Sequence, residues 1–192
     1  VLLREAHDAY GLPVTVFRPG LMLTHTRHVG QVNVPDVFTR LLLSVLVTGL
    51  APGTFHGLYT PVHHGGLPVD FVAEFIAGVG DGTAPGFETF NMISPYDGGK
   101  SLDRVVGGLA VTRIDDYGDW LVRFEAALRA LPRRQRQQSL LPLLHAFAAP
   151  AAPVEPLEIP TGHFLAAAGD VPPVTAELIA KYRADFTHLG LI

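Results

Sequence analysis

The apolar run Val14–Phe17 constrains the fold most, because it is continuous, rich in β-branched residues and bounded by chain-breaking residues. It lies within the stretch LPVTVFRPGLMLTH, residues 12–25, and is followed by Pro19 and Gly20. A short uninterrupted run of this kind predicts a strand buried on both faces, as in a parallel sheet covered by helices. Pro19 cannot donate to a strand ladder and Gly20 tolerates positive φ, so we expect the strand to end there.

The end of this predicted strand is the first candidate site. In an open α/β sheet, ligands bind beyond the carboxyl ends of the strands. Pro19, Gly20 and Leu21 are therefore the residues that we expect beside a cofactor or substrate. A strand followed by a turn that binds nothing is the alternative, and the pattern alone leaves both open.

The composition indicates a globular chain and excludes several functions. The 192 residues are 48% hydrophobic and 17% charged, with a net charge of −4 and no cysteine. So mild a charge gives no reason to expect nucleic acid or an anionic membrane as a partner. Without cysteine, disulfides, thiolate nucleophiles and cysteine-bound zinc are excluded, and a reducing cytoplasm fits. We expect no secretory signal and no membrane span, since no apolar run approaches roughly 20 residues.

The periodicity predicts an α/β chain whose second half is almost wholly helical. Further strands are expected at 88–93 and 111–114. Helices are expected at 1–10, 37–48, 71–77, 102–109, 117–130, 132–147, 161–168 and 175–189, with an Ala/Pro-rich extended connector over 148–160. The first helix lacks an initiator Met and a capping residue, so we expect the chain to be the carboxyl-terminal part of something longer.

The familiar catalytic and phosphate-binding motifs are missing. The glycines of Gly78–Gly82 have the wrong spacing for G-x-G-x-x-G and follow a helix instead of opening one. Tyr96 and Lys100 match the Tyr-x-x-x-Lys spelling of short-chain reductases, but Pro95 and two glycines predict a loop there, not the helix that this pair requires. No histidine spacing suits a metal, and no Gly-x-Ser-x-Gly elbow occurs. We therefore expect neither a catalytic residue nor a metal site in this chain.

A basic run follows the helix expected at 117–130. It comprises Arg129, Arg133, Arg134 and Arg136. A solvated face that favours the carboxyl end of a helix is the ordinary explanation. A docking surface for an acidic partner is the sharper hypothesis.

Several long phrases together resemble a known family. They are VLLREAHDAYGLPVTVFRPG, QVNVPDVFTRLLLSVLVTGLAPGTF, HHGGLPVDFVAEFI, RIDDYGDWLVRFEAALRALPRRQRQQSLLPLLHAF and LIAKYRADFTHLGLI. These phrases resemble the terminal reductase domain of carboxylic acid reductases and the thioester reductase domains that end some nonribosomal peptide synthetases. Both are extended short-chain dehydrogenase/reductases.

The resemblance implies an activity, cofactors and partners. It implies an NADPH-dependent reductase that releases an acyl thioester, held on a phosphopantetheinyl carrier domain of the same polypeptide, as an aldehyde or further as an alcohol. An adenylation domain that uses ATP would precede both. The family's Tyr-x-x-x-Lys and phosphate loop would lie before Val1, so we expect this chain alone to be inactive.

The resemblance also implies a fold and residue roles. Residues 1–114 would be the end of a Rossmann-like part interleaved with substrate-lobe segments, and 115–192 a helical carboxyl-terminal substrate lobe. Pro19, Gly20 and Leu21 would lie beside the nicotinamide, and Val69, Asp70 and Ala73 would form a strand-to-helix element. His25, Gln31 and Phe38 are expected to line the passage for the pantetheine arm or acyl chain, although core packing explains Phe38 equally well.

The chain departs from the family in two ways. Many carboxylic acid reductases read Arg-Cys-Asp where this chain has Arg18-Pro19-Gly20, which leaves open whether reduction stops at the aldehyde. The segments 55–63 and 98–111 are shorter than in the family.

Two alternative functions stay open: a sugar-nucleotide epimerase or dehydratase of the same superfamily, or a non-catalytic helical module that docks a carrier domain.

Overall fold

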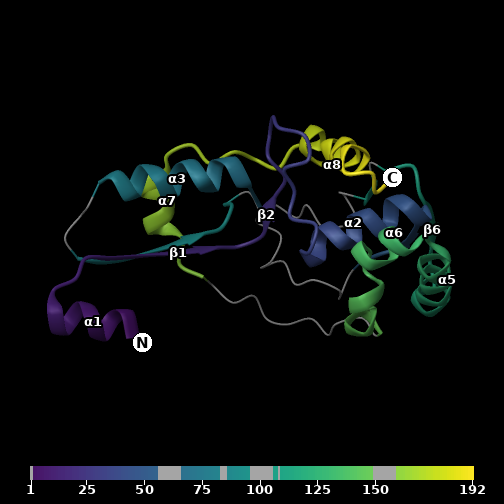
Figure 1. Cartoon of the computed structure of the whole chain (residues 1–192), viewed down its shortest axis with the longest axis horizontal. Helices are drawn as coiled ribbons and strands as arrows, with labels where there is room; N and C mark the ends of the chain where they lie inside the picture. The colour runs from purple at the N-terminus through teal and green to yellow at the C-terminus, as the bar shows by residue number, and fades with distance from the viewer. Residues whose placement is uncertain (1, 56–65, 83–85, 96–105, 108, 149–158) are drawn as a thin grey trace.

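Parallel strand pairs and a set of helices build an elongated chain. The computed structural model describes residues 2–55, 66–82, 86–95, 106–107, 109–148 and 159–192 (Figure 1). The helices are α1 (Leu2–Tyr10), α2 (Val37–Thr48), α3 (Val69–Asp81), α5 (Tyr117–Ala130), α6 (Arg133–Gln138), α7 (Gly162–Ala168), α8 (Ala176–His188) and the 3-10 helix η2 (Leu141–Phe147). The strands are β1 (Val14–Pro19), β2 (Met22–Leu23), β3 (Leu50–Pro52), β4 (Leu67–Pro68), β5 (Phe87–Met92) and β6 (Thr112–Ile114).

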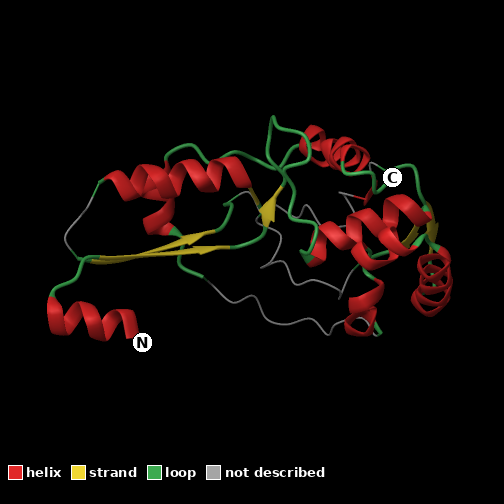
Figure 2. Cartoon of the chain, in the orientation of Figure 1, coloured by secondary structure: helices red, strands yellow, loops and turns green. Residues whose placement is uncertain are grey.

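The strands pair in parallel, as the α/β prediction requires. β1 pairs with β5 from Val14 opposite Phe87 to Pro19 opposite Met92. β2 pairs with β4, and β3 pairs with β6, each over two or three residues. Because parallel neighbours need long crossover connections, each pair joins segments far apart in the sequence. Figure 2 shows the long β1–β5 pair at one end of the molecule and most of the helices at the other.

The predicted burial of β1 on both faces is wrong. Val14, Val16 and Phe17 are half-buried, whereas Thr15, Arg18 and Pro19 are exposed. Within the described residues β5 is the partner of β1, so the other edge of the strand and part of its faces stay open to solvent. A continuous apolar run indicates that both faces of a strand can be buried. Within the described residues, other elements cover the faces of β1 only in part.

Aromatic side chains hold the strand end together. Phe75 of α3 makes edge contacts with Phe90 of β5 and with Phe164 of α7, at ring-centroid distances of 5.3 and 5.2 Å. Phe164 is fully buried. Although α7 belongs to the predicted lobe 115–192, it returns to pack beside α3 and β5 (Figure 1). The boundary at 114/115 stays a prediction.

Two further hydrophobic clusters form the helical end. Trp120, Phe124 and Leu128 lie on one face of α5 as predicted, and all three are fully buried against β3 and η2. The second cluster joins α2 to α8 through Leu42, Leu43, Tyr182 and Phe186 and takes in Leu191 near the chain end. The second cluster positions α8 next to the segment that follows β2.

Capping residues start the helices where the sequence predicts. Side-chain oxygens of Asp36, Asp116 and Thr175 each accept the backbone N–H three residues later, at the starts of α2, α5 and α8. This arrangement satisfies an amide that the helix itself leaves free. Gly49 ends α2 with φ +68°, the left-handed conformation that favours glycine.

Two predicted helices differ from those observed. The helix expected at 71–77 runs from Val69 to Asp81, through Gly78 and Gly80, because an interior glycine costs only about 1 kcal/mol relative to alanine. The helix expected at 132–147 is broken into α6 and η2. Pro142 has no N–H to donate, and its ring would clash with the carbonyl four residues earlier, so one continuous helix cannot form.

Other expectations are met in part or lie outside the described residues. The strands at 88–93 and 111–114 and the helices at 161–168 and 175–189 are confirmed within a residue or two. β2 and β3 were not predicted, because two or three residues carry no periodicity. β4 and α3 form the strand-to-helix element that the resemblance implied at Val69, Asp70 and Ala73, with all three residues in the helix. Tyr96 and Lys100, most of the helix at 102–109 and most of the connector at 148–160 lie outside the described residues.

Candidate functional site

The bend after β1 is held by backbone hydrogen bonds on both sides. The Gly20 N–H donates to the Met92 carbonyl at 3.1 Å, and the Leu67 N–H donates to the Leu21 carbonyl at 2.9 Å. The chain therefore passes here from the β1–β5 pair to the β2–β4 pair. Pro19 and Gly20 are exposed and Leu21 is half-buried. The bend therefore has a fixed backbone and an accessible surface, without a bulky side chain at Gly20.

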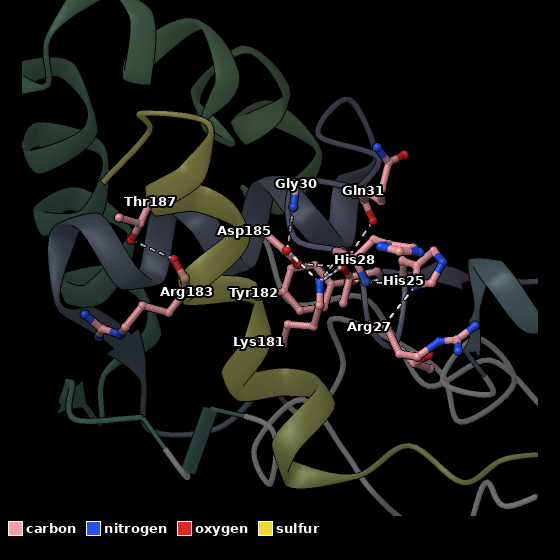
Figure 3. Close-up of polar contacts among 12 residues, drawn as sticks. His25, Arg27, His28, Gly30, Gln31, Lys181, Tyr182, Arg183, Asp185 and Thr187 are labelled. Carbon is pink, nitrogen blue, oxygen red and sulfur yellow. Dashed lines mark hydrogen bonds and ion pairs between the residues drawn. The ribbon is translucent and has the colours of Figure 1, made fainter.

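The segment Thr24–Gln31, which we call the polar loop, follows β2 and is tied to α8. Asp185 of α8 is fully buried. The Thr24 hydroxyl donates to its Oδ2 at 2.5 Å, and the Gly30 N–H donates to its Oδ1 at 2.8 Å (Figure 3). One carboxylate thus holds both ends of the polar loop.

Lys181, one turn earlier on α8, completes this arrangement. Its ammonium group donates to Asp185 Oδ1 at 2.6 Å, to the His28 carbonyl at 2.8 Å and to Thr24 Oγ1 at 3.3 Å (Figure 3). The two side chains are only 13% and 0% exposed. Removing both charges from water is costly unless each finds a partner and further hydrogen bonds. Here the polar loop supplies those further bonds, so the ion pair and the loop conformation depend on each other.

Tyr182 adds a neutral contact to the same loop. Its phenol oxygen accepts the Thr24 N–H at 3.1 Å. Burial raises the pKa of Tyr182 well above its usual range, so the phenol stays protonated at neutral pH. Phe38 of α2 lies edge-on to the Tyr182 ring at a centroid distance of 6.0 Å. Phe38 therefore reaches the polar loop through Tyr182.

The other side of the polar loop contacts the start of α3. Nδ1 of His25 accepts the N–H groups of Arg27 and His28 at 3.0 and 3.2 Å. An accepting Nδ1 leaves the proton of the neutral ring on Nε2. Asp70 accepts the N–H of Thr26 at 3.1 Å and also its hydroxyl, and its Oδ2 lies 3.5 Å from His25 Nδ1.

Hydrogen bonds determine the charge state of Asp70. Burial alone raises the pKa of this carboxyl group. The side-chain hydrogen bond from Thr26, backbone hydrogen bonds and the nearby His25 outweigh burial and lower the pKa below its ordinary value of 3.8. Asp70 is therefore an anion at neutral pH, placed between the polar loop and α3.

Glycine is required at one position of the polar loop. Gly30 has φ +84°, and a Cβ built there would lie 2.7 Å from Cδ2 of His188 on α8. The positive φ strains any other residue, and a Cβ would also require the exposed His188 ring to move. The loop therefore rests directly against α8.

The structure brings most of the predicted site residues into one region. The polar loop contains His25 and Gln31, and the His25 N–H donates to the Gln31 carbonyl at 3.0 Å. Pro19, Gly20 and Leu21 form the bend just before it, and Phe38 touches it through Tyr182. Whether these residues bind cofactor or substrate stays a prediction.

Sequence reasoning missed the residues that hold the loop. These are Thr24, Lys181, Tyr182 and Asp185. The spacing of Lys181 and Asp185 on a predicted helix is a signal that could have indicated an ion pair on one face. It gave no sign that the partner of this pair is a loop more than 150 residues away in the sequence.

The described residues add two negative findings. They contain no group of three His, Cys, Asp or Glu side chains arranged to hold a metal ion. None of the helices in the described part of the chain has the length and apolar character needed to cross a bilayer.

Comparisons with known proteins match this fold and site region. The family model described as "Male sterility protein", an NAD-binding model, matches residues 1–76. Carboxylic acid reductases of Mycobacterium marinum and Mycobacterium tuberculosis are 49% and 47% identical over the whole chain, which spans 18% of each relative. An isonitrile lipopeptide synthase of Mycobacterium tuberculosis is 41% identical, and the chain spans 9% of it.

Solved structures give the same result. The reductase (R) domain of a nonribosomal peptide synthetase from Mycobacterium tuberculosis matches with a TM-score of 0.85 and 40% identity, over 99% of this chain and 49% of that one. The terminal R domain of the myxalamid pathway matches in fold, with a TM-score of 0.64 and 24% identity, over 100% of this chain and 47% of that one.

The fold and these matches indicate which class of protein the chain resembles. The fold is the one seen in reductase domains of the extended short-chain dehydrogenase/reductase class, and the first 76 residues match an NAD-binding model. Over its whole length the chain is similar to the reductase domains of carboxylic acid reductases and of a nonribosomal peptide synthetase. It spans less than a fifth of the curated relatives and about half of the solved reductase domains.

The lowered pKa of Asp70 predicts how stability depends on pH. Because the folded-state pKa lies below 3.8, the carboxylate stabilises the fold above that pH and loses this contribution as the pH falls through the folded-state pKa. Asp70→Asn should therefore destabilise the reductase domain at neutral pH and progressively less under acid conditions. Urea unfolding at a series of pH values measures the difference.

A matched variant tests the physical cause. Thr26→Val keeps the carboxylate and the backbone donor but removes the hydroxyl donor, so its loss of stability should follow the same pH trend with a smaller size. A loss of stability in Asp70→Asn that stays constant from acid to neutral pH would contradict the account.

Proposed function

We propose that this chain is part of an NADPH-dependent reductase that releases a carrier-bound acyl thioester as an aldehyde. The observation that carries the proposal is the similarity to carboxylic acid reductases over the whole chain, at 44–49% identity. The carrier would be a phosphopantetheinyl domain of the same polypeptide, and an adenylation domain would load it with ATP. The lack of cysteine agrees with a reducing, cytoplasmic setting.

The residues of this chain would position the reactants. When bound, NADPH supplies the hydride. Pro19, Gly20 and Leu21 would contact the nicotinamide face from the open bend. Hydride transfer requires the acyl carbonyl to be held close to that face in a fixed orientation. The polar loop, anchored by Asp185 and Asp70, would provide a rigid wall next to the bend.

The polar loop would also guide the thioester arm. His25 can present an Nε2–H donor because its Nδ1 is occupied by two backbone N–H groups. An amide carbonyl of a pantetheine arm could accept that hydrogen bond. Gln31 is exposed on the same loop, and Phe38 is half-buried behind it. Without the family's Tyr–Lys pair, this chain by itself is expected to be inactive.

The full-length protein provides the direct test of the reaction. Supplied with NADPH and an acyl thioester, it should oxidise NADPH and form aldehyde, with one NADPH consumed for each aldehyde released. Absorbance of NADPH and mass spectrometry of the product measure the two quantities. No turnover of the thioester, together with conversion of a nucleotide sugar, would favour the epimerase or dehydratase alternative.

The residue at position 20 should influence whether the reduction stops at the aldehyde or continues to the alcohol. Negative charge builds on the carbonyl oxygen in both reductions, but the thioester is held by its carrier arm whereas the released aldehyde must bind unaided, so a nearby carboxylate should disfavour the second reduction more. Gly20→Asp should therefore lower the alcohol-to-aldehyde ratio at least about fivefold, the factor for roughly 1 kcal/mol between two charges 4 Å apart in water. Gly20→Asn is the uncharged control of similar size. An unchanged ratio in Gly20→Asp would remove the proposed role of this position.

A further inference from the structure

An exposed cationic surface lies at the helical end of the molecule. We call it the arginine face and define it by Arg129 at the end of α5 and Arg133, Arg134 and Arg136 on α6. All four side chains are exposed. Residues 126–148 contain these four arginines and no Asp or Glu, although the chain as a whole has a net charge of −4. The positive charge is therefore concentrated in one place.

Little of this charge is neutralised within the described residues. Arg129 pairs with Glu125 at 2.6 Å. Arg134 and Arg136 instead donate to backbone carbonyls, of Leu189 at 2.7 Å and of Arg129 at 3.1 Å. Carbonyl oxygens fix the orientation of a guanidinium group but leave its charge uncompensated. One carboxylate thus faces four guanidinium groups in the described part of the chain.

The arginine face is hollowed by a cavity of about 360 Å³. Arg129, Arg136, Gln137, Leu141 and Pro142 line it. The surface that lines it is almost wholly apolar, so Arg129 and Arg136 contribute mainly the carbon atoms of their side chains. An apolar side chain of a partner suits this open hollow, and carboxylates beside that side chain would face the exposed guanidinium groups.

Helix α2 connects the arginine face to the polar loop. Arg40 Nη1 donates to the carbonyls of Gln137 and Ser139, each at 2.9 Å. Phe38, two residues earlier on α2, contacts Tyr182, which holds Thr24. Residues two apart project from nearly opposite sides of a helix. Helix α2 and the Tyr182 ring therefore lie between the arginine face and the polar loop.

We propose that the arginine face docks the carrier domain that delivers the acyl thioester. This inference rests on the proposed function. The docked surface would present carboxylates to the arginines and an apolar side chain to the cavity. Nucleic acid is disfavoured, because the net charge of the chain is negative. Docking here would place the base of a long flexible arm on the other side of α2 from the polar loop.

Two arginines on α5 provide a matched test. Arg129 and Arg123 are similarly exposed, at 67% and 62%, and each is paired with an acidic residue one turn earlier. Arg129 lines the cavity and Arg123 does not. In the full-length protein, we compare Arg129→Glu and Arg136→Glu with Arg123→Glu. The readout is single-turnover NADPH oxidation with the acyl group either loaded on the protein's own carrier domain or supplied as soluble acyl-coenzyme A.

The expected result is selective. Arg129→Glu combined with Arg136→Glu should slow reduction of the carrier-bound acyl group about tenfold at low salt, because reversed charges at an interface mainly weaken encounter. Raising the salt to about 1 M should bring the rate of the double variant closer to the wild-type rate, since exposed charges are then screened. Reduction of acyl-coenzyme A should be unchanged, and Arg123→Glu should behave as wild type with both substrates. Arg136→Gln should show a smaller effect in the same direction.

Other outcomes decide against the proposal. Equal rates with the carrier-bound substrate in all variants would overturn docking at the arginine face while leaving the reductase function intact. An equal fall with both substrates would show a structural role. Failure of the wild-type protein to reduce either substrate would overturn the proposed function itself.

Discussion

The buried carboxylate of Asp185 is the interaction on which the site region depends. It has no exposed surface and receives hydrogen bonds from Thr24, Gly30 and Lys181. A charge at this depth persists only if all its partners are present together. The polar loop cannot leave α8 without exposing this charge unpaired, so a segment with no regular secondary structure has one fixed conformation.

This anchoring explains how separate parts of the chain form one surface. Asp185 attaches the polar loop to α8, and Asp70 attaches it to α3. The bend at Gly20 is held by β5 and β4 on either side. The strand end and the helical end are therefore joined through the polar loop, next to the residues expected at the nicotinamide. The proposed reductase activity would need such rigidity, because hydride transfer depends on short and well-oriented contacts.

Much of this architecture could be predicted from the sequence, because it rests on local chemistry. Asp36, Asp116 and Thr175 mark helix starts through their own side chains, and Val14–Phe17 marks a strand through its composition. The burial of β1 could not be predicted, because it depends on which strands lie beside it. Pro142 favours a break in the helix, but the helical periodicity on both sides of it predicts one continuous helix. At the site, Gly20 was predicted from a strand end and His25 from the resemblance to the family, whereas Asp185 and Lys181 act on a loop more than 150 residues away.

Hydrogen exchange in the polar loop tests the central role of Asp185 most directly. Six of its amides donate hydrogen bonds in the folded state: Thr24 to Tyr182, His25 to Gln31, Thr26 to Asp70, Arg27 and His28 to His25, and Gly30 to Asp185. Asp185→Asn keeps the side-chain size but removes the charge, and hydrogen bonds to charged groups contribute about 1.5–3 kcal/mol each. Peptides covering 24–31 should therefore exchange about tenfold faster or more in this variant, while peptides from the buried middle of α2 keep their protection. Unchanged exchange in the polar loop, or an equal rise in both regions, would contradict the account.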